Sequence, residues 1–168
     1  MILDAMADEL AVELGEFCVD RRIVLSAAES CTGGMVAAAI TSVAGASKWF
    51  DRGFVTYSNE AKTELLGVSP QTLETFGAVS EETAREMALG ALSNSFSNVA
   101  FSVTGIAGPD GGTDDKPVGT VCFGFAFDGK VVTATRRFRG NRDSVRQQSV
   151  HHVLASLLTM AQRPVATQ

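Results

Sequence analysis

Residues 23–43 read IVLSAAESCTGGMVAAAITSV, and this stretch decides the fold. The apolar run 23–28 predicts a short buried strand, because it is brief, continuous and aliphatic. The small and polar residues 29–34 end that strand, and a helix is expected from about Met35 to Val43. A strand, a turn of small residues and a helix open an α/β unit.

The same alternation continues on both sides of this unit. An amphipathic helix is expected over 2–20, strands at 54–57, 99–104, 118–127 and 130–138, and a hairpin turn at Asp128-Gly129. Further helices are expected at 60–66, from Ser69-Pro70 onward, from a Ser80 cap to about Leu92, and from an Asn141 cap through Ala161, with a frayed tail at 163–168. Interleaved helices and strands with one late hairpin predict an α/β fold, a three-layer α/β/α sandwich with a mixed β-sheet.

The composition is that of a globular protein. The chain has 168 residues, 14 Lys+Arg and 19 Asp+Glu, so its formal net charge is −5. We expect residues 1–168 to form a single domain, since no linker or composition break divides them. The acidic balance disfavours nucleic-acid binding. No apolar run is long enough for a membrane span and the acidic N-terminus is unlike a signal peptide, so a cytoplasmic protein is expected.

Three polar segments follow predicted strands, where ligands gather in open α/β sheets. Residues 29–34 place backbone amides at a helix start, which suits an anion such as phosphate, although a plain capped helix reads the same way. Residues 105–112 hold four glycines in eight positions after Thr104. Such a loop can gather amides around an anion or an oxyanion, and it can equally be a mobile surface loop.

The third segment, 47–62, holds Ser47, Tyr57 and Lys62. A lysine can activate a serine if the lysine is neutral, and partial burial lowers its pKa toward that state. A tyrosine could relay the proton or orient the lysine. The spacing does not show that the three side chains converge, and a solvated helix lysine is the plainer interpretation of Lys62.

Other constellations carry weaker signals. His151 and His152 are the only histidines, and as helix neighbours they diverge, which disfavours a histidine triad or metal site. The aspartates at 110, 114 and 115 could bind a divalent ion but are typical turn formers. The cysteines at 18, 31 and 122 fit neither a disulfide framework nor a zinc pattern. Cys31 could be a nucleophile at a helix start, and a small buried cysteine is the commoner outcome.

Five motifs in order carry a family resemblance: AESCTGG at 28–34, GFVTYSNEAK at 53–62, GAVS at 77–80, TGIAGPDGG at 104–112 and KPVGTV at 116–121. Over about residues 5–162, the chain resembles the C-terminal domain of the competence/damage-inducible protein CinA. The resemblance implies an amidohydrolase that converts nicotinamide mononucleotide to nicotinate mononucleotide and ammonia, in pyridine nucleotide recycling. It also implies a serine and lysine rather than a histidine at the site, with no metal or organic cofactor.

The resemblance places Tyr57 and Lys62 in the catalytic site and leaves two candidate nucleophiles. Ser47 is favoured over Ser30, which would then position the ligand. The implied substrate contacts come from the glycine-rich turns and the last helix, at Thr32, Gly33, Thr104, Gly105, Gly108, Arg142 and Arg146. The expected partner is a small nucleotide, with no nucleic acid or membrane, and a homodimer is expected because amphipathic end helices in such small domains often pair. The alternatives are a non-catalytic nucleotide-binding or regulatory module, and a metal-assisted nucleotide hydrolase.

Overall fold

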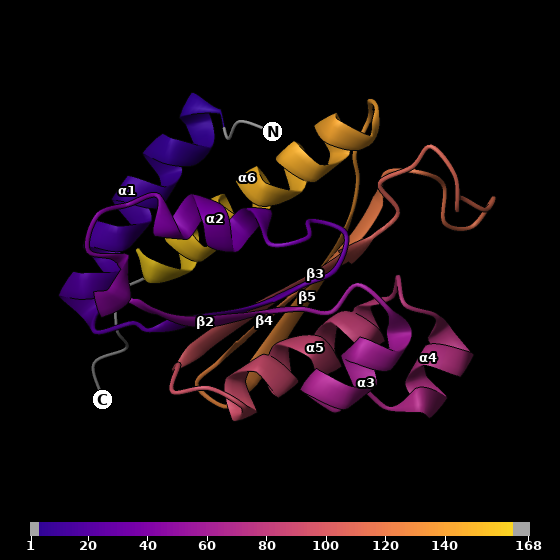
Figure 1. The fold of residues 1–168 in the computed structure, drawn as a ribbon, viewed down its shortest axis with the longest axis horizontal. Coiled ribbons are helices and arrows are strands. Elements are labelled where there is room, and N and C mark those ends of the chain that lie inside the picture. Colours follow the sequence, from indigo (N-terminus) through magenta and orange to yellow (C-terminus); the bar gives the residue numbers. More distant parts are fainter. Residues whose placement is uncertain (1–3, 163–168) are drawn as a thin grey trace.

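A computed structural model describes residues 4–162 of the chain (Figure 1). The two outermost residues of the helix expected from residue 2, and the tail 163–168, lie outside the described residues. The elements are α1 (Ala5–Arg21), β1 (Leu25–Glu29), α2 (Met35–Thr41), the 3₁₀ turn η1 (Ala46–Lys48), β2 (Phe50–Val55), α3 (Asn59–Leu66), α4 (Pro70–Phe76), α5 (Glu81–Ser93), β3 (Val99–Gly105), β4 (Thr120–Phe127), β5 (Lys130–Arg137) and α6 (Arg142–Ala161).

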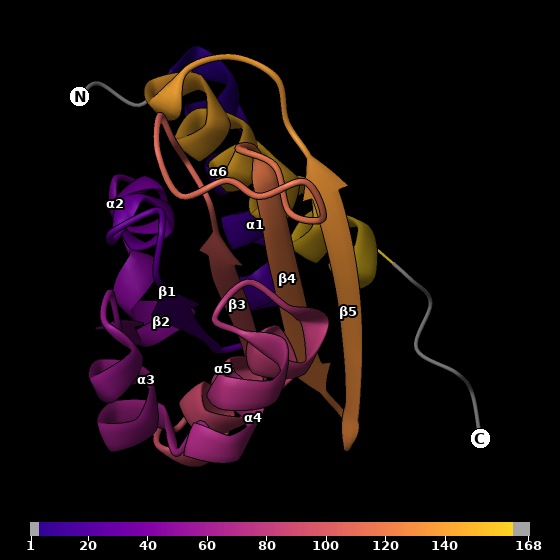
Figure 2. The same cartoon turned by 90° about the vertical axis from the view of Figure 1, so that its right-hand side faces the viewer.

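The strands form one mixed sheet in the order β2-β1-β3-β4-β5. Strand β1 pairs in parallel with β2 and with β3, whereas β3, β4 and β5 are successively antiparallel. Figure 2 shows β3, β4 and β5 side by side, with the long connection between β3 and β4 at one end of the sheet. The predicted mixed sheet and its late hairpin are confirmed.

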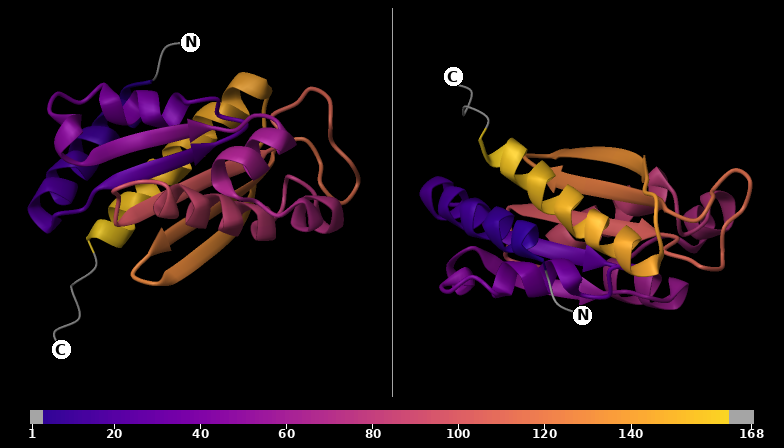
Figure 3. Two further views of the ribbon diagram at one scale, coloured as in Figure 1. Left: turned by 60° about the horizontal axis from the view of Figure 1, so that its bottom comes forward. Right: turned by 90° about the horizontal axis from the view of Figure 1, so that it is seen from above.

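Helices cover both faces of the sheet, so the predicted three-layer sandwich is also confirmed. Helices α1, α2 and α6 pack on one face, and α1 and α6 run beside each other there (Figure 3). Helices α3, α4 and α5 lie on the other face (Figure 1). The larger apolar core, which contains Trp49, Phe101 and Phe123, lies under the first group of helices. A smaller core around Leu66, Val68 and Met87 lies under the second group. None of the described helices is both long and apolar enough to cross a membrane.

The helix starts follow the predicted capping residues. Ser80 Oγ accepts a hydrogen bond from the backbone N–H of Thr83, and Asn141 Oδ1 accepts one from Ser144. Each satisfies an amide that the first helical turn leaves without a partner. The helix after Gly34 ends earlier than expected, at Thr41 instead of Val43.

The strand predicted at 54–57 is wrong in both of its boundaries. Pairing with β1 begins earlier, where the Leu25 N–H donates to the carbonyl of the buried Trp49 at 2.8 Å. Pairing ends where the Thr56 N–H donates to the Glu29 carbonyl at 2.9 Å. The chain then turns outward to the cap of α3, which leaves Tyr57 62% exposed. Strand β2 therefore spans Phe50–Val55, and Tyr57 lies beyond it.

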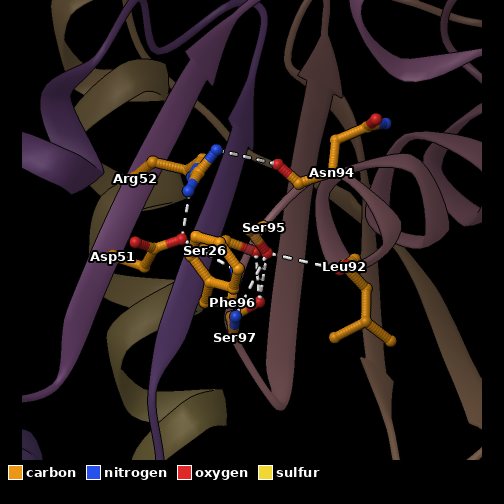
Figure 4. Close-up of polar contacts among 8 residues, drawn as sticks. All are labelled: Ser26, Asp51, Arg52, Leu92, Asn94, Ser95, Phe96 and Ser97. Atoms are coloured by element: carbon orange, nitrogen blue, oxygen red, sulfur yellow. Dashed lines mark hydrogen bonds and ion pairs between the residues drawn. The ribbon is translucent and has the colours of Figure 1, made fainter.

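A polar cluster ties the amino ends of the parallel strands together (Figure 4). Arg52 on β2 pairs with Asp51 at 2.7 Å and donates to the Asn94 carbonyl at the end of α5. Its guanidinium lies over the Phe96 ring. Ser26 on β1 shares a 2.7 Å hydrogen bond with Ser97, just before β3. The turn that enters β3 is therefore fixed to both β1 and β2.

The opposite edge of the sheet gathers the carboxyl ends of β1, β2 and β3. From β1 the chain crosses through α2 to β2 on one side, then returns through α3, α4 and α5 to β3 on the other side. The strand order therefore reverses at β1. In open α/β sheets the crevice beyond such a reversal is the usual ligand position.

The close packing of α3 against α5 generates a stability prediction. Alanine at Gly90 is expected to destabilise the fold by about 1–3 kcal/mol, because its Cβ would overlap the backbone carbonyl of Leu66. This loss opposes the gain of nearly 1 kcal/mol that alanine normally brings to a helix. Urea unfolding of Gly90→Ala measures the change, with the exposed Arg85→Ala on the same helix as a near-neutral control. A Gly90→Ala variant as stable as wild type would refute the close approach.

Candidate active site

A serine and a lysine from different elements meet at the carboxyl edge of the sheet. Ser30 directly follows β1, and Lys62 lies on the buried side of α3. The Lys62 Nζ is 3.0 Å from Ser30 Oγ and 2.9 Å from the carbonyl oxygen of Thr56. Both side chains are withdrawn from solvent, with Lys62 only 1% exposed.

The surroundings of Lys62 favour its neutral form. Burial lowers the pKa of Lys62 below its ordinary value, because removal from water destabilises the charged ammonium. Among the ion pairs of residues 4–162, none joins a carboxylate to Lys62. A neutral amine has two N–H groups and one lone pair. It can donate to Thr56 and still accept the proton of Ser30, which is what a general base for this hydroxyl requires.

The pair opens into a cavity of about 170 Å³. Its walls come from the turns after β1, β2 and β3, from the approach to α5 and from the start of α6. The lining residues are Ser30, Cys31, Tyr57, Asn59, Lys62, Ala78, Val79, Thr104, Gly105, Ala107 and Arg142. Of the site residues named from the sequence, the structure thus brings together Ser30, Tyr57, Lys62, Thr104, Gly105 and Arg142.

Several lining residues were missed by the sequence reasoning. Asn59 is the first residue of α3, and Ala78 and Val79 belong to the GAVS motif at 77–80. The Thr104 hydroxyl donates to the Ala78 carbonyl at 2.8 Å, which fastens this segment to the tip of β3. GAVS is one of the five family motifs, and this membership was the sequence signal that could have placed Ala78 and Val79 at the site.

Arg142 and Tyr57 meet at the mouth of the cavity. Arg142 Nη2 donates to the Tyr57 hydroxyl at 2.9 Å, and Nη1 donates to the Gly108 carbonyl at the same distance. Both side chains are exposed. A cation and a phenol at the rim can meet the charged part of an anionic ligand. Gly108 contributes its carbonyl to this contact and does not line the cavity.

The predicted anion position at the start of α2 is already filled. The Glu29 carboxylate accepts hydrogen bonds from the Val36 and Ala37 amides and from the Thr32 hydroxyl, at 2.9, 3.0 and 2.6 Å. An internal anion therefore occupies the place that phosphate would take. Thr32 and Gly33, expected from the sequence to contact the ligand, do not line the cavity.

Arg146 supports the same turn from α6. Its Nε donates to the Cys31 carbonyl at 3.0 Å, and Nη2 donates to the Thr32 carbonyl at 3.3 Å. The side chain is not part of the cavity wall. The structure therefore separates the two arginines proposed for phosphate: Arg142 reaches the cavity and Arg146 holds the backbone beside it.

Ser47, the favoured nucleophile, is not brought to Lys62. It lies exposed in η1, before β2 begins, whereas Tyr57 and Lys62 follow the end of β2. A strand rises by about 3.3 Å per residue, so the six residues of β2 separate Ser47 from the site by about 20 Å. The expectation that Ser47 acts with Lys62 is corrected, and Ser30 takes the position next to the lysine.

The cysteine and histidine candidates do not join the Ser30–Lys62 pair. Cys31 is a small buried cysteine, as the commoner outcome has it, and burial raises the pKa of its thiol to about 12, which opposes thiolate formation. His151 bonds Asp4 at 2.7 Å, and His152 packs on the Phe123 ring. Within residues 4–162, no group of three or more His, Cys, Asp or Glu side chains is arranged to hold a metal ion.

Comparison with known proteins yields a consistent group of relatives. The "Nicotinamide-nucleotide amidohydrolase PncC" of Enterobacter agglomerans is 58% identical over 151 residues, which cover 89% of this chain and 92% of that protein. The protein of the same name from Escherichia coli K12 is 49% identical over 155 residues, covering 92% and 94%. A "Putative competence-damage inducible protein" of Symbiobacterium thermophilum is 50% identical over 157 residues, which span 37% of that longer chain.

Solved structures agree with this group. The competence/damage inducible protein CihA of Agrobacterium tumefaciens is 43% identical, with a TM-score of 0.93 over 96% of this chain and 99% of that one. A CinA superfamily protein of Escherichia coli has a TM-score of 0.90 at 37% identity, over 95% and 94% of the two chains. The family described as the CinA C-terminal domain matches residues 7–161. The chain therefore belongs to the CinA C-terminal domain family.

Proposed function

We propose that this protein hydrolyses the carboxamide of nicotinamide mononucleotide, giving nicotinate mononucleotide and ammonia, with Ser30 as nucleophile and Lys62 as general base. The observation that carries the proposal is the buried 3.0 Å contact between Ser30 Oγ and Lys62 Nζ at the wall of a small cavity. The names of the relatives from Enterobacter and Escherichia supply the substrate. In the cell this reaction serves the recycling of pyridine nucleotides, in the cytoplasm.

The first half of the mechanism is acyl transfer to the enzyme. Lys62 takes the Ser30 proton as Ser30 Oγ bonds to the carboxamide carbon, and the carbonyl electron pair moves onto oxygen. When the intermediate collapses, the C–N bond breaks and the Lys62 ammonium gives its proton to the departing nitrogen. Ammonia leaves and an ester of Ser30 remains. The positive pyridinium ring makes this carboxamide a better electrophile.

Water completes the reaction by the reverse proton path. Lys62 removes a proton from water, the hydroxide attacks the ester carbon, and the proton returns to Ser30 Oγ as the carboxylic acid leaves. Backbone amides at the cavity wall stabilise the oxyanion of each step. The N–H of Ala107, a residue of the cavity wall, suits this role, since its amide makes no hydrogen bond within residues 4–162.

The charged end of the substrate is assigned to the cavity mouth. Arg142 is a lining cation within reach of solvent, and the N-terminus of α2 is closed to phosphate by Glu29. Arginine suits phosphate because its guanidinium donates several hydrogen bonds in one plane. Tyr57, held by Arg142, lies where it can contact the same group.

The proposed substrate predicts a ranking of ammonia release. Nicotinamide mononucleotide is expected to react much faster than nicotinamide riboside, and riboside at least as fast as free nicotinamide, because Arg142 contacts only the phosphate-bearing compound. Coupled measurement of ammonia with the three compounds side by side tests this order. Equal rates on mononucleotide and free nicotinamide would contradict the phosphate contact.

The same assay separates the two alternative functions. Absence of ammonia from all three compounds would favour a non-catalytic binding module. Loss of activity in EDTA with rescue by a divalent ion would favour a metal-assisted hydrolase.

The Ser30–Lys62 assignment predicts the outcome of four substitutions. Lys62→Arg is expected to lower kcat about 100- to 10,000-fold, close to Lys62→Ala, because arginine stays charged and accepts no proton. Ser30→Ala should form no acyl-enzyme in rapid-quench mass spectrometry. Ser47→Ala is the matched control and should retain wild-type kcat. An acyl adduct on Ser30→Ala, or a tenth of wild-type kcat in Lys62→Arg, would overturn the assignment.

The neutral lysine also predicts a pH profile. A general base acts when unprotonated, so kcat/KM is expected to rise with pH through the pKa of Lys62 in the free enzyme. Burial lowers that pKa, so the midpoint should lie below the ordinary lysine value of about 10.4. Steady-state measurement of kcat/KM across pH tests this rise, and Tyr57→Phe is the control variant that should still show it. If the rise of kcat/KM with pH disappears in Tyr57→Phe, the pH dependence belongs to the tyrosine and the assignment to Lys62 is contradicted.

A further inference from the structure

The residue before the proposed nucleophile carries a buried carboxylate. Glu29 is the last residue of β1 and is only 1% exposed. Successive strand residues face opposite sides of a sheet, so its side chain points toward α2 whereas that of Ser30 points toward α3. The contacts agree, since Glu29 bonds the first turn of α2 and Ser30 bonds Lys62.

Three hydrogen bonds meet this buried carboxyl group. Oε1 accepts from the Thr32 hydroxyl at 2.6 Å and from the Val36 amide at 2.9 Å, and Oε2 accepts from the Ala37 amide at 3.0 Å. The ion pairs of residues 4–162 do not include Glu29. A buried carboxylate without enough donors is costly, so the loss of any one donor disturbs the group.

Further hydrogen bonds fix the turn that carries Ser30. The backbone N–H of Ser30 donates to the Val103 carbonyl at 2.9 Å, and the Ser30 carbonyl accepts from the Gly33 N–H at 3.0 Å. Two residues along, the Thr32 hydroxyl is bound to Glu29 on one side and the Thr32 carbonyl to Arg146 on the other. These contacts fix the backbone of the turn between the end of β1 and the start of α2.

We propose that Glu29 and Thr32 are positioning residues for catalysis, and that their hydrogen bond holds the Ser30 hydroxyl in line with Lys62. This inference rests on the proposed Ser30–Lys62 mechanism and extends it to the opposite face of the sheet. Neither residue touches the cavity, so their effect passes through the backbone of the turn. A reacting atom displaced by about 1 Å slows a reaction about 100-fold, while substrate binding elsewhere in the site is kept.

Substitution of Thr32 gives a graded test. Thr32→Val keeps the shape and removes the hydroxyl, so kcat is expected to fall at least about 10-fold with KM little changed. Thr32→Ser restores the hydroxyl and should return kcat to within about threefold of wild type. Ser102→Ala is the matched control, because it removes another buried hydroxyl bond, to the Ala84 carbonyl, away from the cavity wall. It should lose stability and keep kcat.

A second readout measures Ser30 without the substrate. A fluorophosphonate probe phosphonylates an activated serine: an O–P bond forms, the P–F bond breaks, fluoride leaves and Lys62 takes the proton. The labelling rate of Ser30 should fall in Thr32→Val and recover in Thr32→Ser. Labelling that keeps this dependence in a protein inactive on nicotinamide mononucleotide supports the positioning role and counts against the proposed substrate.

Two results would overturn the inference. One is a folded Thr32→Val protein that labels at the wild-type rate, and the other is a fall in kcat of equal size in Ser102→Ala. Should Thr32→Val fail to fold, Glu29→Gln is measured in its place. That variant removes the charge from the acceptor of the Thr32 hydroxyl and turns the acceptor of the Ala37 amide into a donor, so both contacts are disturbed. A wild-type labelling rate in folded Glu29→Gln would refute the positioning role.

Discussion

The burial of a single amino group is the constraint on which this site depends. Lys62 lies within α3, yet its Nζ reaches the carboxyl ends of β1 and β2 and meets Ser30 and the Thr56 carbonyl there. A charged ammonium in that position would lack a compensating carboxylate, so the environment selects the neutral amine. In the proposed mechanism this amine is the base, and neither of the two histidines, which lie on α6, takes part.

The N-terminus of α2 is bound by a carboxylate of the chain itself. A helix N-terminus at the carboxyl edge of a parallel sheet would ordinarily be open to a ligand anion. Here Glu29 fills that position from within the chain, so the amides of α2 stabilise the turn instead of a phosphate. The anion-binding end of α2 is thus used within the chain, and Arg142 at the rim is the cavity-lining cation that we propose for the ligand phosphate. The two faces of one strand end therefore carry different contacts: Glu29 bonds the start of α2, and Ser30 bonds Lys62, with which we propose that it acts.

Much of the fold followed from periodicity and capping residues, because those signals are local. The mixed sheet, the Asp128-Gly129 hairpin and the caps at Ser80 and Asn141 were all predictable in this way. The proposed nucleophile was not, since Ser47 and Ser30 both lie in short segments of small and polar residues that contain glycine. The choice depends on which edge of the sheet each serine occupies: Ser30 follows β1 at the carboxyl edge, whereas Ser47 precedes β2 at the amino edge. A strand expected only at 54–57 leaves the position of residues 47–53 relative to the sheet open. The sequence pattern places Glu29 in a polar turn, whereas it ends β1, where strand alternation turns its side chain away from that of Ser30.

The antiparallel hairpin explains how the last helix completes the site. Parallel strands bring three turns to one edge, but each turn is a separate segment that nothing in the sheet itself connects. The chain leaves β3 at this edge, crosses away along β4 and returns along β5, so α6 begins beside the same turns. Arg142 and Arg146 are four residues apart and therefore share one side of that helix. Their guanidinium groups bind carbonyls and a hydroxyl from all three turns. A return by a parallel crossover would end at the other edge, and these arginines could not reach the Ser30 turn.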